Sequence, residues 1–206
     1  MFSLRKNKLL AVALTAVIIV VVIVSASIYY LGQQNSYTPA IPLEGAGASP
    51  DFTLVDQNGE QFTFSTLKGK VVLIAFGYVH CPDVCPIIMQ KYSALAKSLG
   101  DDIDKVAMVM VTTDPARDTP DALKEYLKMY DSRIIGLTGT FEEVEEVWRK
   151  YQIPVEIEEH EHGDDHYLVS HFALVLVTDE DLVQRFAFTP EMGADEYIAG
   201  VRYLLG

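Results

Sequence analysis

Apolar residues follow one another without interruption in two stretches of the chain, residues 71–76 and residues 106–111. Such continuous runs are typical of strands that are buried on both faces of a sheet. Between them, apolar residues recur at helical spacing: Ile88, Tyr92, Leu95, Ala96 and Leu99. Gly100 ends this stripe, as glycine commonly does after the last turn of a helix. The pattern therefore predicts a β-α-β unit with parallel strands.

Two hairpins are predicted on either side of this unit. Residues 52–55 and 61–64 flank an Asn-Gly pair at positions 58–59, which is a strong signal for a tight turn between two strands. Residues 172–178 and 182–188 are apolar runs separated by three acidic residues. We expect them to form the second hairpin.

Three further helices are predicted from their start signals and apolar stripes. Thr119 caps a helix with Pro120 in its first turn, and Thr140 with Glu143 matches a capping box. Residues 197–205 carry the last apolar stripe. The order of hairpin, β-α-β unit, helices, hairpin and helix is that of a thioredoxin-like α/β fold with an N-terminal hairpin extension.

The first part of the chain has a different pattern. Residues 9–31 form a run of 23 positions without a charged residue, and about 20 apolar residues span a bilayer. Residues 1–8 are basic, and positive charge stays on the cytoplasmic side of a membrane. We therefore expect a single transmembrane helix that holds the following domain on the extracytoplasmic side of the cell membrane. A signal peptide cleaved near residues 25–27 is the competing interpretation, but the apolar run continues beyond that point.

Composition divides the chain into four parts. Residues 32–50 are rich in Gly, Pro, Ser and Ala and lack apolar periodicity, which is typical of a flexible tether. The expected parts are a cytoplasmic basic N-terminus at 1–8, a transmembrane anchor at 9–31, a flexible linker at 32–50 and a thioredoxin-like domain at 51–206.

The charge balance disfavours some partners. The formal net charge of the chain is −13. Nucleic acids and anionic membrane surfaces attract basic domains, so we expect neither as a partner. Most of the acidic charge is explained by solubility.

The two cysteines of the chain lie in one turn between the first buried strand and its helix. Cys81 and Cys85 are separated by three residues, and Pro82 and Pro86 follow them. A disulfide here would close a very short loop and add little stability. We therefore expect the two cysteines to have a chemical role and not a structural one. Pro86 suits the first position of a helix, which makes Cys85 the expected N-cap. The N–H groups of a helix start favour the thiolate form.

A histidine far along the sequence completes a possible metal site. Thiolates serve both redox exchange and soft-metal binding, so the two cysteines alone leave that choice open. His171 precedes an apolar strand, and in a thioredoxin-like fold the loop before this strand faces the reactive turn. Two thiolates and an imidazole suit Cu(I), or Cu(II) with a fourth ligand. Zinc usually takes four ligands, and His80, Asp83 or a water are the candidates for a fourth.

Two polar segments have less specific patterns. Residues 156–166 contain His160, His162 and His166 among acidic residues. We expect a solvated loop here rather than a transient metal site. Residues 114–118 follow a strand end and are either a turn stabilised by internal ion pairs or a segment that docks a partner.

Three motifs in this order closely resemble the Sco/SenC family. They are residues 76–86 (FGYVHCPDVCP), residues 111–120 (VTTDPARDTP) and residues 168–171 (LVSH). Members of this family are membrane-anchored, thioredoxin-like copper chaperones for cytochrome c oxidase. The resemblance extends over about residues 50–206 and implies that Cys81, Cys85 and His171 are the copper ligands. Family members often have Asp where Ser170 stands here.

The resemblance implies one function and leaves a second open. The first is delivery of copper to the binuclear copper centre of cytochrome c oxidase subunit II, by a protein that is not a classical enzyme. The alternative is an exported thiol:disulfide oxidoreductase in which Cys81 and Cys85 are catalytic and reduce the cysteines of the oxidase copper site. For either function, another copper chaperone or a thioredoxin-like reductant is a candidate further partner. A peroxiredoxin-like peroxidase shares the fold but has no support from the turn sequence.

Overall fold

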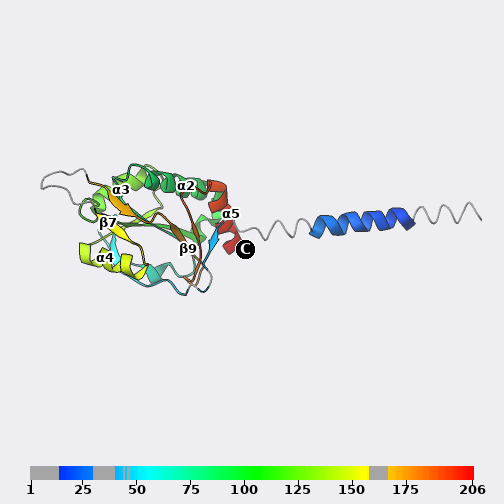
Figure 1. Cartoon of the computed structure of the whole chain (residues 1–206), viewed down its shortest axis with the longest axis horizontal. Coiled ribbons are helices and arrows are strands. Elements are labelled where there is room, and N and C mark those ends of the chain that lie inside the picture. Colours follow the sequence, from blue (N-terminus) through cyan, green and yellow to red (C-terminus); the bar gives the residue numbers. More distant parts are fainter. Residues whose placement is uncertain (1–13, 30–39, 44, 46, 158–166) are drawn as a thin grey trace, which may run out of the picture. The chain divides into compact units, whose positions relative to one another are not determined.

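The computed structural model describes residues 14–29, 40–43, 45, 47–157 and 167–206 (Figure 1). The chain forms two units, residues 1–38 and residues 39–206. In the first unit, residues 14–29 form a helix whose apolar side chains are exposed. No helix among the described residues has the length and hydropathy needed to cross a membrane. Residues 9–13, 30 and 31 of the expected anchor lie outside the described residues.

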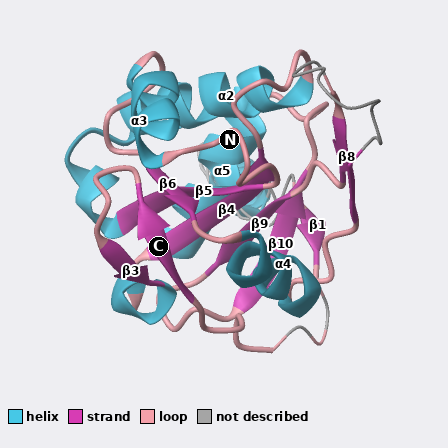
Figure 2. Cartoon of the chain, turned by 90° about the vertical axis from the view of Figure 1, so that its left-hand side faces the viewer, coloured by secondary structure: helices cyan, strands magenta, loops and turns pink. Residues whose placement is uncertain are grey.

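The second unit is built on an eight-stranded sheet with the order β1-β10-β9-β4-β5-β6-β2-β3 (Figure 2). Its strands are β1 (Ile41–Pro42), β2 (Thr53–Asp56), β3 (Gln61–Thr63), β4 (Val71–Gly77), β5 (Val106–Thr112), β6 (Ile135–Thr138), β9 (Val175–Thr178) and β10 (Gln184–Phe188). Strands β4, β5 and β6 are parallel neighbours, and the remaining pairs are antiparallel. The central β4 is paired on both sides, by β5 and β9.

Helices cover both faces of this sheet. They are α2 (Val84–Leu99), α3 (Pro120–Lys128), α4 (Phe141–Lys150) and α5 (Ala194–Leu205), together with the 3₁₀ helices η1 (Phe64–Leu67) and η2 (Gly100–Lys105). Figure 1 shows α2, α3 and α5 on one side of the sheet and α4 on the other. Side chains of β4 alternate between the two sides. Val71, Leu73 and Ala75 pack with α2 and α5, whereas Val72, Ile74 and Phe76 pack with α4. This double burial explains the continuous apolar run.

The predicted β-α-β unit, the two hairpins and the caps at Thr119 and Thr140 are confirmed. Strands β4 and β5 are parallel and joined through α2. The first hairpin joins β2 to β3 and turns at Gly59, whose φ of +82° is open to glycine. The second joins β9 to β10. Thr119 accepts a hydrogen bond from Ala122 N, and Thr140 forms a capping box with Glu143.

The expected flexible linker differs from the structure over its last part. Strand β1 pairs with β10, and Ala40 before it is buried. Gly47 O accepts from Gln184 N, and Ser49 N donates to Leu182 O. Edge pairing depends on backbone groups rather than on apolar periodicity, so a Gly- and Pro-rich composition conceals it. Residues 30–39 lie outside the described residues.

The solvated loop predicted over residues 156–166 is wrong at its start. Strand β7 (Val155–Ile157) pairs antiparallel with β8 (Val169–His171) in a separate two-stranded sheet. The strand expected from residue 172 is also displaced, because the chain forms β8 before that position and enters β9 only at Val175. Three-residue strands are too short to show a reliable alternation of apolar and polar positions. Figure 2 shows β8 outside the large sheet.

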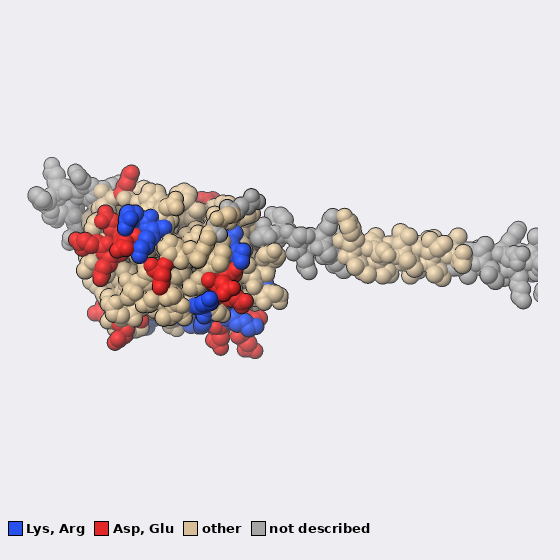
Figure 3. Space-filling view, turned by 90° about the horizontal axis from the view of Figure 1, so that it is seen from below, with Lys and Arg blue, Asp and Glu red and all other residues tan. Residues whose placement is uncertain are grey.

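Charged side chains of both signs lie together on the surface of the second unit. The face seen in Figure 3 carries acidic groups beside basic ones. Ion pairs of the second unit include Lys68–Asp181 at 3.4 Å and Arg185–Asp179 at 2.5 Å. An exposed pair such as Lys68–Asp181 contributes little to stability.

The capping box of α4 is expected to be a measurable part of the stability. In Thr140→Ala, Glu143 N loses the hydroxyl that accepts its hydrogen bond, and we expect the free energy of unfolding to fall by about 1 kcal/mol. Urea denaturation followed by circular dichroism measures the change. Gln90→Ala at an exposed position of α2 is the control and is expected to stay within about 0.5 kcal/mol. Equal stability of both variants would contradict the role of the cap.

Candidate metal centre

The two cysteines lie where the central strand ends and its helix begins. Strand β4 ends at Gly77, a turn follows, and α2 starts at Val84. Cys81 N donates to Tyr78 O at 3.2 Å within this turn. Cys85 lies in the first turn of α2, and both cysteines are free and buried.

The predicted N-cap is wrong by two residues. Asp83, and not Cys85, precedes the first helical residue. The first N–H groups of a helix have no hydrogen-bond partner within the helix. Pro86 lacks an N–H, and in the first turn this costs no hydrogen bond, so the helix can start before Pro86. Cys85 is therefore a residue of the first helical turn and not its cap.

The structure brings His171 to the two cysteines. The donor atoms of Cys81, Cys85 and His171 all lie within 4.8 Å of one another. His171 Nε2 is 3.6 Å from Cys85 Sγ. Among the described residues these three form a group of possible metal donors, and neither His80 nor Asp83 belongs to it. His160, His162 and His166 lie outside the described residues.

Pairing of β7 with β8 positions the histidine. His171 ends β8 and is in register with Val155. Tyr78, from the cysteine turn, accepts a hydrogen bond from Val169 N at its hydroxyl, at 3.3 Å. Its ring meets the His171 ring edge-on, with centroids 5.9 Å apart. The cysteine turn and the histidine strand are therefore joined by one tyrosine as well as by the donor cluster.

The close approach of the two sulfurs shifts the pKa values of the two thiols in opposite directions. A hydrogen bond from Cys85 to the Cys81 sulfur, helped by one from His171, lowers the pKa of Cys81 to about 4 despite its burial. The same bond and the deeper burial of Cys85 raise the pKa of its thiol well above the ordinary value. The two cysteines therefore titrate as a coupled pair in which Cys81 loses its proton before Cys85.

The donor set fits a soft metal ion. Two sulfurs and one imidazole nitrogen are the ligands that monovalent copper prefers. His171 Nδ1 is buried and has no hydrogen-bond partner among the described residues. The side chain of Ser170 is exposed, so the ring orientation depends on packing against Tyr78 and on Cys85. A metal at Nε2 would supply the missing constraint on the ring.

Gly77 is a positioning residue that the sequence pattern does not single out. A Cβ atom at Gly77 would lie 2.6 Å from Cys85 Sγ. No side chain can occupy that space while Cys85 keeps its place. The strand therefore ends in glycine so that the sulfur of the next helix can lie against its backbone.

A buried polar network holds the cysteine turn from behind. Asp118 is fully buried and accepts hydrogen bonds from Thr112 Oγ1 at 2.7 Å and from Val79 N at 3.2 Å. Burial raises the pKa of Asp118 to about 7, because two hydrogen bonds offset the loss of water only in part. The carboxyl group thus fixes the backbone two residues before Cys81.

The neighbouring aspartate holds the other side of the site. Asp114 is fully buried, pairs with Arg117 and accepts from Tyr167 Oη at 2.7 Å. Arg117 lies 3.5 Å from the centre of the Tyr167 ring and donates to Tyr167 O at 3.0 Å. Tyr167 leads into β8, so the network reaches both segments that carry the donors.

This network bears on the two interpretations of residues 114–118. The ion pair between Asp114 and Arg117 confirms a turn stabilised internally. Asp114 and Asp118 are both buried, and docking of a partner by this segment stays a prediction. Sequence reasoning missed their connection to the site because charged residues are rarely buried, and no pattern in one sequence marks those that are.

Comparisons with known proteins agree with this geometry. Residues 42–206 match the family model described as SCO1/SenC. The chain belongs to the SCO1/SenC family. It is 38% identical over 151 residues to the SCO2-like protein of Rickettsia conorii, covering 72% of this chain and 70% of that one. It is 40% identical over 131 residues to mitochondrial SCO2 of Saccharomyces cerevisiae, covering 63% of this chain and 44% of that one.

A solved structure of the SCO1/SenC family shares the fold. ScoI of Bradyrhizobium japonicum, solved with copper bound, superposes with a TM-score of 0.70 at 35% identity. The match covers 76% of this chain and 99% of that chain. The thioredoxin-like α/β fold of the second unit is thereby confirmed as the fold of this family.

We expect Asp118 to make stability depend on pH in an unusual direction. Its folded pKa of about 7 exceeds the ordinary 3.8, so the folded chain retains a proton that the unfolded chain has lost between these values. The contribution to stability is full below pH 4 and is lost as pH rises through 7. Relative to Asp118→Asn, the wild-type protein should lose about 1 to 4 kcal/mol from pH 4 to pH 8.

Denaturation of both proteins by urea at a series of pH values measures this difference. Asp131→Asn is the contrasting control, because the hydrogen bond from Arg133 lowers the pKa of Asp131. Its contribution is therefore lost as pH falls. A pH-independent difference between wild type and Asp118→Asn would show that the buried carboxyl is not protonated in the folded state near pH 6.

Proposed function

We propose that this member of the SCO1/SenC family is a copper chaperone. It binds copper through Cys81, Cys85 and His171 and transfers it by ligand exchange to the binuclear copper centre of cytochrome c oxidase subunit II. The observation that carries the proposal is the convergence of two sulfurs and one imidazole nitrogen within 4.8 Å. The relative from Bradyrhizobium japonicum, whose structure contains copper, supports the choice of metal.

Three ligands suit a metal that has to leave again. A trigonal site with soft donors holds Cu(I) and leaves a direction open for a fourth donor from an acceptor. An incoming thiolate can then bind before a resident donor is released, so the ion is never free in solution. Cys81 is the more exposed of the two cysteines, at 8% against 2%, and is the donor that we expect an acceptor to displace first.

We further propose that residues 9–31 anchor the protein in the cell membrane, with the copper-binding domain on the extracytoplasmic side. The support is the run of 23 positions without a charged residue and the basic segment before it. A binuclear copper centre on that side of the membrane would be within reach of a domain held in this way.

A second candidate is thiol:disulfide exchange, favoured by the placement of two free cysteines side by side. The Cys81 thiolate would attack a partner disulfide and release one partner thiolate. That partner thiolate would take the proton of Cys85, and the Cys85 thiolate would attack the Cys81 sulfur and release the second partner thiolate. A disulfide is then left in this chain, and the partner is reduced to one thiol and one thiolate. Such a reaction does not need His171.

His171 therefore separates the two functions. We expect His171→Ala to weaken Cu(I) binding by about 100-fold, or roughly 2.8 kcal/mol, because one of three ligands is lost. Competition with a chromophoric Cu(I) chelator measures the affinity of the reduced protein. His80→Ala is the matched control, since His80 is exposed and outside the donor cluster. Unchanged copper affinity in His171→Ala, with disulfide exchange intact, would contradict the proposed copper site and favour thiol:disulfide exchange as the function.

Gly77 tests the geometry of the same site without removing a ligand. In Gly77→Ala the new methyl group would meet Cys85 Sγ at 2.6 Å, so we expect copper affinity to fall by about tenfold, or roughly 1.4 kcal/mol. Gly47→Ala is the control, because a Cβ there meets nothing within 4 Å. Circular dichroism establishes that both variants are folded. Wild-type affinity in a folded Gly77→Ala would show that Cys85 is free to move.

A further inference from the structure

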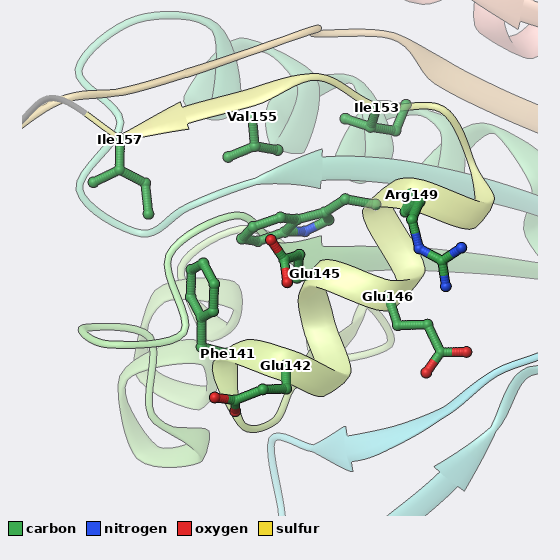
Figure 4. A pocket seen from close by; sticks show the side chains of 9 residues that line it. Phe141, Glu142, Glu145, Glu146, Arg149, Ile153, Val155 and Ile157 are labelled. Carbon is green, nitrogen blue, oxygen red and sulfur yellow. The ribbon is translucent and has the colours of Figure 1, made fainter.

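A concave region lies between α4 and β7. It is a cleft of about 720 Å³, which is within the range of sites that hold small molecules or peptide side chains. Figure 4 shows Val155 and Ile157 of β7 facing the helix across this space, with Phe141 on the opposite side. None of its lining residues belongs to the donor cluster.

The apolar side chains that line the cleft are partly open to solvent. Phe141 is 45% exposed and Ile157 is 40% exposed, although both are large apolar side chains. Phe141 packs edge-on against Trp148, with ring centroids 5.8 Å apart. Contact of exposed apolar side chains with water is unfavourable. An apolar group placed between the two side chains would remove this contact and would be bound favourably.

The rim of the cleft is acidic. Glu142, Glu145 and Glu146 line it together with one cation, Arg149. Glu146 is paired with Lys150 at 3.0 Å. In Figure 4 the carboxylate of Glu145 lies in the space between the helix and β7, beside Phe141. A cationic group that enters the cleft with an apolar side chain would meet this carboxylate.

Strand β7 contacts both the cleft and the residues around the two cysteines. Val155 lines the cleft and also packs with the cluster of Tyr78, Cys81, Cys85 and Val169. In the β7–β8 pair it is in register with His171. A molecule held in the cleft would therefore contact the strand next to the one that carries the histidine.

We propose that the cleft is a docking site for a basic segment of a protein partner that inserts an aromatic or branched aliphatic side chain between Phe141 and Ile157. A neighbouring Lys or Arg of that segment pairs with Glu145. Charge complementarity selects this occupant. A second copy of the chain, with its net charge of −13, is disfavoured by like-charge repulsion. The site goes beyond copper binding and is tested on the metal-free protein.

The single tryptophan of the chain, Trp148, lines the cleft, so its fluorescence reports occupancy directly. The probe is the peptide acetyl-Lys-Phe-Leu-Lys-amide, titrated into the metal-free full chain in nonionic detergent. The matched peptide has Glu in place of both Lys. We expect a saturable change in emission with the basic peptide and at least tenfold weaker binding of the acidic one.

Variants locate the binding. Phe141→Ala is expected to weaken the basic peptide about tenfold, and Glu145→Lys should remove its advantage over the acidic peptide. Glu125→Lys on α3 is the charge-matched control, because Glu125 is exposed and outside the cleft, and it should keep at least half of the wild-type preference. Cu(I) binding by each variant reports that the donor cluster is intact, so that failure of docking and failure of the copper proposal are distinguishable.

Three results would overturn the proposal. The first is the absence of any saturable change at millimolar peptide. The second is equal affinity for the two peptides, or equal effects of Glu145→Lys and Glu125→Lys. The third is an emission change that depends on protein concentration without peptide, which would assign the cleft to a second copy of the chain.

Discussion

Burial of both faces of β4 is the constraint on which the site depends. Because β4 is hydrogen-bonded to β5 and β9 and covered by helices on both sides, its end point cannot shift. Gly77 marks that point, and Cys85 Sγ lies in the space that a side chain at Gly77 would take. The position of Cys85 Sγ is thus a consequence of the packing of the sheet. The turn between Gly77 and α2 is short, and it places Cys81 near Cys85.

Several separate contacts hold the strand that carries the histidine. His171 is 86 positions from Cys85, and it belongs to a two-stranded sheet that is separate from the main one. A hydrogen-bonded tyrosine, Tyr78, joins the cysteine turn to β8, and the Asp114–Arg117 pair holds Tyr167 at the entrance of β8. The position of β8 therefore does not depend on a single contact.

The sequence patterns predicted the large elements well and the small ones poorly. Long apolar runs such as residues 71–76 and full capping signals such as Thr140 with Glu143 have one physical solution, and the structure contains them. Strands β1, β7 and β8 have two or three residues each and depend on partners distant in sequence, which no local pattern records. The nearness of His171 to the cysteines followed from the expected fold. The roles of Gly77 and Asp118 depend on close approach and burial, which become visible only in three dimensions.

The arrangement of β7 explains how one domain can combine a metal site with a separate recognition surface. Val155 of this strand packs with the hydrophobic cluster that contains the two cysteines, and it also lines the cleft against α4. A partner bound at the cleft would gain its affinity from apolar contact and charge, and it would leave the open direction of the metal site free for a donor atom. Recognition and ligand exchange would then use different groups, so that copper could pass at a rate set by the sulfurs while the choice of partner is set by α4 and β7.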